Sequence, residues 1–422
     1  MDRNKKKLIL VTRHYPYFSG EGIFLQTELK ELVMHYQLTI LSTEPEQHRK
    51  ECYDNQYKDC VSFLFYDREK RQNPYKRFFS IIKDFLSITF LREFVHILSS
   101  GEKIKARTVQ SLFFYRESKR FYKWLKKNNI LNKKEAILYY TYWNHYYTLA
   151  VLKRKKQYKD IKVVSRFHGD DLYNERHPER WQPFKRYMDR RIDKCLFVSE
   201  AGRSYYMEKF AHPSSMEENK YETCKIGTKK RQIRNPDKQE GAFCLVSCSA
   251  IIPLKRVDLI VKALSLLKQE KLEWIHFGAG EIEEQVKQLA KELLNKKENI
   301  TYKFMGYCDN EEIMKFYERK HVDCFITTSS TEGLPVSVQE ALSVGIPIIG
   351  TAVGGIPECI DGNGILMSAE PQTKEIAESI QQLYYMEIEQ MQKLRENSYD
   401  LFQREYNGEV NAKKLVEVLD AL

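Results

Sequence analysis

Two glutamates, Glu332 and Glu340, stand on either side of a predicted helix start, in a segment whose residue types suit an anionic ligand. The segment covers residues 329–342. It follows the apolar run 324–326, which is typical of a strand, and Gly345 ends the amphipathic pattern after it. A strand–loop–helix unit of this kind turns backbone N–H groups and the positive end of a helix dipole toward an anion. The pattern therefore predicts an anion-binding loop.

A nucleotide diphosphate needs a cation and N–H donors at its phosphates, and hydrogen-bond acceptors at its ribose. Lys255 precedes a predicted helix, where its ammonium can meet a phosphate. Glu340, one turn into the later helix, can accept hydrogen bonds from two vicinal ribose hydroxyls, as acidic residues do in dinucleotide-binding folds. Taken alone, each side chain could equally be a solvated surface residue. Their shared position at the carboxyl ends of predicted parallel strands favours a nucleotide site.

The first half of the chain offers fewer candidates. Gly20 and Gly22 lie in the loop between the first predicted strand and its helix, an arrangement typical of a Rossmann-like unit but also of a plain turn. His168 follows the predicted strand 161–165, where open α/β sheets place ligand contacts. A hydrogen-bonded loop histidine is the alternative, and the polar neighbours of His168 favour a site residue. Residues 142–145 are further candidates for contacts with an acceptor.

The elements that must position these residues form two alternating arrays of strands and helices, joined by residues 227–241, which lack apolar periodicity. The predicted strands lie at 7–11, 38–41, 61–65, 136–141, 161–165, 194–199, 224–226, 243–247, 274–277, 300–304, 322–327 and 347–350. This alternation predicts an α/β fold with two Rossmann-like, doubly wound domains facing a central cleft. We expect domains at 1–234 and 235–395. A helical segment at 396–422 is expected to pack back toward the first domain.

The net charge of +11 is concentrated in a predicted basic helical insertion at about 68–134, which holds 18 Lys and Arg against 5 Asp and Glu. Aromatic residues alternate with the cations in its second half: Phe113, Phe114, Tyr115, Phe121, Tyr122 and Trp124. Two explanations stay open. The helices are either ordinary surface helices with solvated basic faces, or they bind an anionic membrane surface into which the aromatic residues insert. No nucleic-acid-binding module accompanies the charge, so nucleic acid is not expected as a partner.

The remaining composition bears on the location of the protein. The most apolar stretch, 78–98, is interrupted by charged residues, so no transmembrane helix is predicted. The apolar run after the basic start is too short for a signal peptide. Nine cysteines without a Cys-x-x-Cys pair, in a chain without that signal, indicate a reducing compartment. We therefore expect a cytoplasmic protein, attached peripherally to the inner face of the cell membrane if the insertion binds lipid.

Five motifs in unbroken order over residues 243–367 carry a resemblance to a known family. They are residues 249–258, 277–280, 304–307, the stretch from Glu332 through Gly350, and residues 351–358. With them, the chain resembles the retaining glycosyltransferases of family 4, which have the two-domain GT-B architecture. The N-terminal half matches more thinly, at the Gly20 and Gly22 loop and at His168-Gly169-Asp170. By this resemblance, the first domain is the acceptor side and the second binds a nucleotide sugar.

The resemblance implies three residues at the reacting centre. Lys255 would bind the diphosphate, Glu332 would hold hydroxyls of the transferred sugar, and His168 would contact the donor sugar near its reacting carbon. It also implies donor-binding positions, several of them through backbone N–H groups: Gly20, Gly22, Gly333, Leu334, Val336, Ser337 and Glu340. UDP- or GDP-sugar is the expected donor, with no additional cofactor and no metal.

Two positions depart from the family pattern. Ala250 stands where members often have an arginine, five residues before the phosphate-binding lysine, and Arg256 could compensate for it. Pro335 replaces a frequent glycine and removes a potential N–H donor.

The sequence thus predicts a retaining hexosyltransferase that moves a sugar from a nucleotide-diphosphate donor to a lipid-linked or surface-polysaccharide acceptor, for example in a capsule or cell-wall glycan. Two alternatives remain open. One is a nucleotide-sugar epimerase of the same fold, and the other is a non-catalytic, glycosyltransferase-like partner protein.

Overall fold

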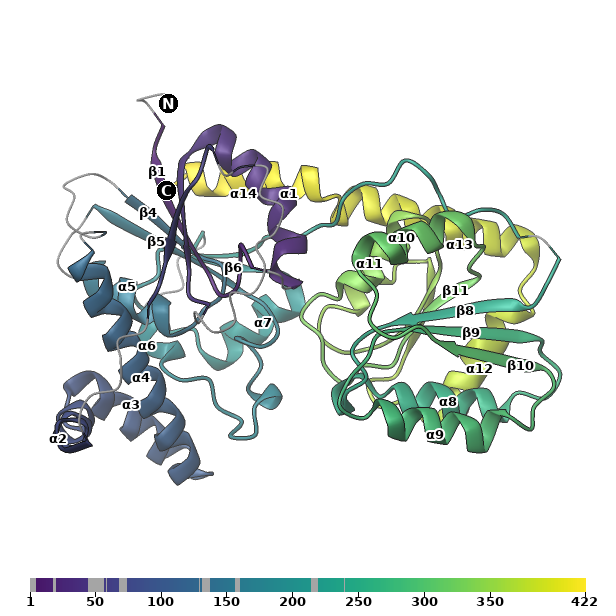
Figure 1. Cartoon of the computed structure of the whole chain (residues 1–422), viewed down its shortest axis with the longest axis horizontal. Coiled ribbons are helices and arrows are strands. Elements are labelled where there is room, and N and C mark those ends of the chain that lie inside the picture. Colours follow the sequence, from purple (N-terminus) through teal and green to yellow (C-terminus); the bar gives the residue numbers. More distant parts are fainter. Residues whose placement is uncertain are drawn as a thin grey trace. The chain divides into compact units, whose positions relative to one another are not determined.

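The computed structural model describes residues 5–17, 20–44, 57, 59–67, 74–128, 130, 137–155, 160–213, 219–238 and 240–422. The chain forms two compact units. Unit 1 comprises residues 1–224 with 412–422, and unit 2 comprises residues 225–411. Each unit has a parallel sheet with helices on its faces (Figure 1). The chain divides at 224/225 and 411/412, whereas the sequence-based boundaries lie at 234/235 and 395/396.

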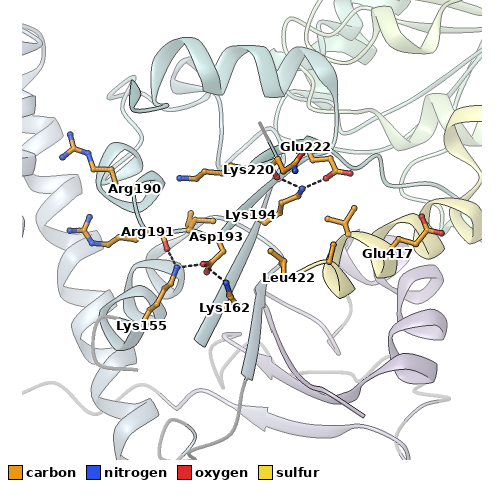
Figure 2. Close-up of a pocket in the computed structure, with 14 residues that line it drawn as sticks. Lys155, Lys162, Arg190, Arg191, Asp193, Lys194, Lys220, Glu222, Glu417 and Leu422 are labelled. Atoms are coloured by element: carbon orange, nitrogen blue, oxygen red, sulfur yellow. Dashed lines mark hydrogen bonds and ion pairs between the residues drawn. The ribbon is translucent and has the colours of Figure 1, made fainter. Parts of the chain in front are cut away.

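The sheet of unit 1 has seven parallel strands in the order β3-β2-β1-β4-β5-β6-β7. Their bounds are β1 (Lys7–Thr12), β2 (Gln37–Ser42), β3 (Ser62–Phe65), β4 (Ile137–Thr141), β5 (Ile161–Phe167), β6 (Lys194–Phe197) and β7 (Tyr221–Thr223). The central strands are apolar at nearly every position because helices cover both faces of a parallel sheet. Polar side chains collect at the amino ends of β5 and β6, where Lys155 pairs with Asp193 at 2.7 Å (Figure 2).

The helices of unit 1 are α1 (Gly20–His35), α2 (Pro74–Phe85), α3 (Ile88–Ser99), α4 (Ile104–Lys127), α5 (Tyr146–Lys155), α6 (Lys185–Asp189) and α7 (Glu200–Lys209). The end of α14 (Gly408–Asp420) joins them. Its Leu415 and Leu419 are buried with Leu25 of α1, and the hydroxyl of Tyr36 donates to Asp420 at 2.6 Å.

The sheet of unit 2 has six parallel strands in the order β10-β9-β8-β11-β12-β13. Its strands and helices are β8 (Phe243–Cys248), α8 (Val257–Leu266), β9 (Leu272–Phe277), α9 (Glu283–Leu294), β10 (Ile300–Phe304), α10 (Asn310–Arg319), β11 (Cys324–Thr327), α11 (Val336–Ser343), β12 (Ile348–Thr351), β13 (Gly364–Met367), α12 (Thr373–Tyr384) and α13 (Ile388–Leu401). Helices α8, α9 and α12 cover one face, and α10, α11 and α13 cover the other (Figure 1). The α/β fold class with two Rossmann-like domains is confirmed.

Two strand predictions need correction. The last strand of unit 1 is not 224–226 but β7, because the register with β6 pairs Cys195 with Tyr221, and the chain leaves the sheet after Thr223. In unit 2 the sequence analysis missed β13. This strand is half-exposed and begins with Gly364, so it lacks the continuous apolar run that marks the inner strands. Ala136, the predicted start of β4, lies outside the described residues.

The predicted insertion folds as α2, α3 and α4, while its residues 68–73, 129 and 131–134 lie outside the described part. Most of the aromatic residues that one of the two open explanations inserted into a membrane are core residues, which counts against that explanation for α4. Phe114, Tyr115 and Phe121 are buried, because α4 lies against α5 and the sheet. Two of the interleaved cations, Arg116 and Lys119, are also engaged, since both pair with the buried Asp84 of α2.

No helix in the described ranges has the length and apolar character needed to cross a bilayer.

Candidate functional site

The candidate site of unit 2 lies where β8 and β11 end, on the two loops that follow them. Lys255 closes a 3-10 turn, Pro253–Lys255, just before α8. The second loop is tied to this turn because the N–H of Ser330 donates to the carbonyl of Leu254 at 2.8 Å, and the hydroxyl of Thr328 donates to the carbonyl of Lys255 at 3.1 Å. The sheet therefore brings together two loops that are far apart in sequence.

Lys255 and Glu332 meet between these loops. The ammonium of Lys255 donates to Oε1 of Glu332, and the hydroxyl of Ser329 donates to the same oxygen at 2.8 Å. The side chain of Lys255 is 23% exposed and that of Glu332 is 9% exposed. The cation predicted for the phosphates and the carboxylate predicted for the sugar are thus direct neighbours, and a flexible lysine can change partners.

Glu340 is buried on α11 and has a different environment. The amide of Asn310 donates to its Oε1. Burial raises the pKa of Glu340 to about 8, with the Arg231 guanidinium and the Asn310 hydrogen bond acting in the opposite direction. At neutral pH the carboxyl group is therefore largely protonated. The sequence analysis identified Glu340 but not Asn310 or Arg231, whose positions carry no local motif.

Cys248, at the end of β8, links the two halves of this site. Burial raises the pKa of its thiol, the charge of Glu340 raises it further, and the charge of Lys255 lowers it. Lys255 and Glu340 therefore both lie near the end of β8.

The loop at Gly333 is held close to the segment after β12. The N–H of Gly355 donates to the carbonyl of Gly333 at 3.0 Å. Gly354 has φ 51°, and a Cβ there would lie 1.7 Å from the carbonyl oxygen of Glu332, so only glycine fits. Leu334 is buried at the tip of the loop.

Helix α11 begins without a side-chain cap, because its N-cap residue is Pro335. Val336 and Ser337 are its first two residues, so their N–H groups have no acceptor within the helix. These are the two positions predicted to donate to phosphates, and they lie where such donors are needed.

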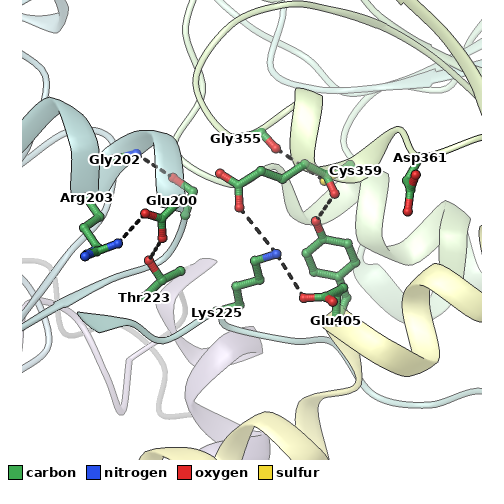
Figure 3. Close-up of polar contacts among 12 residues, drawn as sticks. Glu200, Gly202, Arg203, Thr223, Lys225, Gly355, Cys359, Asp361 and Glu405 are labelled. Atoms are coloured by element: carbon green, nitrogen blue, oxygen red, sulfur yellow. Dashed lines mark hydrogen bonds and ion pairs between the residues drawn. The ribbon is translucent and has the colours of Figure 1, made fainter. Parts of the chain in front are cut away.

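A polar cluster supports the loop that carries Gly354. Lys225 pairs with Glu358 at 3.4 Å and with Glu405 at 3.1 Å (Figure 3). The hydroxyl of Tyr406 donates to the carbonyl of Glu358 at 2.5 Å. Glu405 and Tyr406 belong to a π-helical turn, Phe402–Tyr406, which follows α13. This turn thereby fixes the segment that touches Glu332.

The side chain of Arg256 binds backbone carbonyl groups, unlike that of its neighbour Lys255. It adopts φ 50°, and its guanidinium donates to three backbone carbonyls: those of Thr328 at 2.6 Å, Ser329 at 2.9 Å and Ala369 at 2.9 Å. These bonds clamp the loop after β11. Contact with phosphates remains a prediction for this residue, and the geometry favours its role in holding the loop.

In unit 1 the loop after β1 is organised by Glu21, between the two predicted glycines. Its carboxylate accepts hydrogen bonds from the N–H groups of Arg13 at 3.0 Å, His14 at 2.6 Å and Tyr15 at 2.7 Å, and from Nε1 of Trp143 at 2.8 Å. Gly20 begins α1, and Gly22 is buried in its first turn. The sequence analysis named the glycines and missed Glu21, whose position between them was the available signal.

His168 follows β5 and is buried. Its Nε2 lies 2.9 Å from the carbonyl oxygen of Tyr142, which can only accept, so Nε2 carries the hydrogen and Nδ1 is the acceptor. Its ring lies 4.1 Å from that of Trp143, between centroids. Burial lowers the pKa of His168 to about 3, and the charge of Arg166 lowers it too. The ring is therefore neutral at physiological pH.

Two buried charged residues, Asp171 and Lys185, hold His168 in place, and neither was identified from the sequence. Asp171 accepts from the N–H groups of His168 at 2.7 Å and Asn144 at 2.6 Å, while Lys185 donates to Oδ1 of Asn144 at 2.6 Å. Burial raises the pKa of Asp171 to about 6 and lowers that of Lys185 to about 8. Nothing local marks Lys185, because its partners are brought to it only by the fold.

No group of three or more His, Cys, Asp or Glu side chains within the described ranges is arranged to hold a metal ion. Metal independence remains a prediction.

The whole architecture has counterparts among solved structures. The sucrose-phosphate synthase of Thermosynechococcus elongatus superposes with a TM-score of 0.70 at 14% identity, over 99% of each chain. Anabaena HepE, solved in complex with UDP and glucose, superposes with a TM-score of 0.65 at 13% identity, over 99% of this chain and 100% of that chain. The chain has the GT-B fold.

Sequence comparisons point the same way. Residues 228–401 match the family model described as "Glycosyl transferases group 1". The amylovoran biosynthesis glycosyltransferase AmsK of Erwinia amylovora is 24% identical over 242 residues, which are 55% of this chain and 58% of AmsK. The chain spans less than two thirds of the length of AmsK and of the putative colanic acid biosynthesis glycosyltransferase WcaL of Escherichia coli, another relative that it matches. These similarities support the glycosyltransferase superfamily, and the matched residues contain Lys255, Glu332 and Glu340.

Proposed function

We propose that the protein is a retaining hexosyltransferase of glycosyltransferase family 4. It would move a sugar from a nucleotide-diphosphate donor to a lipid-linked or surface-polysaccharide acceptor. The observation that carries the proposal is the meeting of Lys255 with Glu332 beside the uncapped start of α11. One flexible cation, one carboxylate and a row of N–H donors match the needs of a diphosphate joined to a sugar. The matched relatives named for polysaccharide biosynthesis, such as AmsK, support this class of acceptor.

In the proposed reaction, Lys255 leaves Glu332 and pairs with the diphosphate of the donor. Glu332 is then able to accept hydrogen bonds from hydroxyls of the donor sugar. The N–H groups of Val336 and Ser337 and the positive end of α11 add to the stabilisation of the phosphates. Glu340 accepts from the ribose hydroxyls and so anchors the part of the donor that stays behind.

The chemical step breaks the bond between the anomeric carbon and the phosphate oxygen, and the acceptor oxygen bonds to the same face of that carbon. The proton of the acceptor hydroxyl passes to the departing phosphate. Negative charge grows on the diphosphate as the bond breaks, so Lys255 and the start of α11 stabilise the transition state more than the bound donor. His168, which is neutral, contributes a hydrogen-bond acceptor at Nδ1 rather than a charge.

The test is a panel of UDP- and GDP-sugars, with nucleotide release and sugar transfer as readouts. Lys255→Ala should lower kcat/KM by about 10²–10³-fold, the usual effect of removing a transition-state stabiliser. Glu340→Ala should weaken nucleotide binding by about tenfold or more, because it removes acceptors for two hydroxyls. Lys262→Ala is the matched control, since Lys262 lies on the exposed side of α8 and pairs only with Asp258 among the described residues.

Three outcomes would contradict the proposal. Loss of donor binding in Glu340→Ala without any loss in Lys255→Ala would refute the assigned roles. Isomerisation of the donor sugar without an acceptor, followed by NMR, would instead indicate an epimerase. Failure to bind any nucleotide by calorimetry would indicate a non-catalytic partner protein.

We also propose that the protein acts at the cytoplasmic face of the membrane, and that α2 and α3 make the contact. Exposed apolar side chains gather on these helices and on the turn between them: Phe79, Ile82, Leu86, Ile88, Leu91, Val95 and Leu98. On α3 they recur at intervals of three and four residues, opposite the buried Phe90 and Ile97, so one face of the helix is apolar and unpacked. Exposed Lys83 and Arg92 accompany it. Apolar insertion beside cations is the pattern of interfacial binding to anionic lipid.

Vesicle sedimentation tests this contact. Ile88→Asp should reduce binding to vesicles with anionic phosphatidylglycerol by about tenfold or more, since it places a repelled charge at the lipid surface. The matched control is Ile388→Asp, because Ile388 belongs to unit 2 and is 86% exposed against 72% for Ile88. Equal binding by both variants, or no binding at low salt by the parent chain, would refute the proposal.

A further inference from the structure

Unit 1 contains a strongly basic pocket at the amino ends of its strands (Figure 2), whereas His168 follows the carboxyl end of β5. It has a volume of about 740 Å³ and lies where β5, β6 and β7 begin. Its six basic side chains, Lys155, Lys162, Arg190, Arg191, Lys194 and Lys220, outnumber the three acidic ones, Asp193, Glu222 and Glu417. All the lining residues belong to unit 1. The volume is within the range of sites for small molecules, and the lining is polar.

Part of the positive charge is already engaged. Lys155 pairs with Asp193 at 2.7 Å, and Lys194 pairs with Glu222 at 2.5 Å. Lys220 is buried, donates to the carbonyl of Asp189 and lies 3.9 Å from the carboxylate of the same residue. These contacts orient the three lysines around the pocket and pair their charges, which leaves the other three cations as the excess.

The other three cations have weaker or uncharged partners, or none for the side chain. Lys162 is 3.9 Å from Asp193, with a side chain that is 48% exposed. Arg191 donates to the carbonyl of Tyr187 at 2.8 Å and lies over the ring of the same residue at 3.8 Å, so both of these contacts are with uncharged groups. The side chain of Arg190 forms no hydrogen bond or ion pair with the part of the chain that the structure describes. An excess of cations that face one another in a concave space is unfavourable unless an anion joins them.

We propose that this pocket binds a phosphate-bearing ligand at a site separate from that of the sugar donor. Arginine guanidinium groups bind phosphate oxygens in pairs, and lysine ammonium groups add point charges, so the residue types match this ligand. The site is not a continuation of the one at His168. Lys162 and His168 are six positions apart along β5 and the residue after it. At ~3.3 Å per position, the distance between them along the strand is about 20 Å.

The last turn of α14 forms one wall of the pocket, through Glu417, Val418 and Ala421. A bound phosphate would therefore connect α14 to the start of β6 and β7, and it would stabilise the packing of this helix on unit 1. Glu417, Glu222 and the carboxyl end of α14 oppose an anion. The affinity must consequently come from the cations, and removal of an opposing carboxylate should raise it.

Hydrogen exchange on the full chain, with pyrophosphate as the probe, tests the site. Pyrophosphate should slow exchange at residues 190–194, 219–223 and 412–422. The double variant Lys162→Ala/Arg190→Ala should weaken this effect by about tenfold or more, through loss of two charge-assisted contacts. The control Lys126→Ala/Lys127→Ala removes the same charge from the exposed end of α4 and should leave it unchanged. Glu417→Gln should tighten binding by about threefold.

Vesicles with phosphatidylglycerol, compared with neutral phosphatidylcholine vesicles, distinguish a lipid headgroup from a soluble phosphate. Protection by pyrophosphate supports a soluble ligand, and protection by anionic vesicles alone supports a headgroup. Protection by neither, or an equal loss in both double variants, would overturn the proposal. Protection near Lys255 and α11 reports on the donor site separately. Absence of protection there leaves the proposal for the pocket intact, and absence of protection at the pocket leaves the proposed donor site intact.

Discussion

The key carboxylates of the two units are held in opposite ways. In unit 2, Glu332 accepts from the side chains of Lys255 and Ser329, and Glu340 accepts from that of Asn310. In unit 1, Glu21 accepts from three consecutive backbone N–H groups and from the indole N–H of Trp143, and Asp171 accepts from two backbone N–H groups. Side-chain donors can rotate away and give their place to a ligand, whereas backbone donors cannot. The carboxylates of unit 2 are therefore suited to bind, and those of unit 1 are suited to shape loops.

The largest expected difference between the carboxylates of the two units is in the free energy of unfolding. Glu21→Gln places an NH₂ group against buried N–H donors that lose their acceptor, at a cost of about 1–3 kcal/mol each. With two donors on each carboxylate oxygen, the free energy of unfolding should fall by about 2–6 kcal/mol. Urea denaturation with an unchanged slope would measure it.

Glu332→Gln is the matched comparison for that variant. The same exchange in unit 2 should change the unfolding free energy by about 1 kcal/mol or less, since the ammonium and hydroxyl around Glu332 can reorient toward the amide oxygen. Its cost should appear as lost activity instead. Equal destabilisation by the two substitutions would show that the carboxylates do not differ in this way.

The same contrast explains how much could be predicted from the sequence. Unit 2 follows the regular strand–loop–helix alternation, and its site residues lie at the ends of strands with strong apolar patterns. Lys255, Glu332 and Glu340 could be named for that reason, together with the α/β class. Their contacts were not predictable, because the Lys255–Glu332 pair joins two loops that only the finished sheet brings together.

Unit 1 was harder to interpret because its decisive contacts depend on burial. Lys185 looks like any surface lysine in the sequence, yet it is buried beside Asn144 and close to Asp171. The aromatic residues of α4 are the opposite case, because their sequence pattern suggests exposure and the structure buries most of them. Residues such as Phe121 alternate with lysines and arginines, but α4 turns them into the core, while one apolar face of α3 stays exposed. A one-dimensional pattern does not reveal which face of an isolated helix packs.

A smaller effect would sharpen the comparison through pH. Burial raises the pKa of Glu340 to about 8, above the value of 4.5 expected in the unfolded chain. The folded state therefore binds a proton more tightly, and the contribution of this group to stability, complete below pH 4.5, is lost as the pH rises through 8.

Ribose hydroxyls that donate to the carboxylate of Glu340 would favour its ionised form. UDP binding at pH 7 should then release protons, and the affinity should rise several-fold between pH 7 and 8.5. Calorimetry in buffers of different ionisation enthalpy measures the release. Glu340→Gln should abolish both the release and the rise, and their persistence in that variant would show that another group carries the proton. Because His168 is already neutral over this range, its protonation should not contribute.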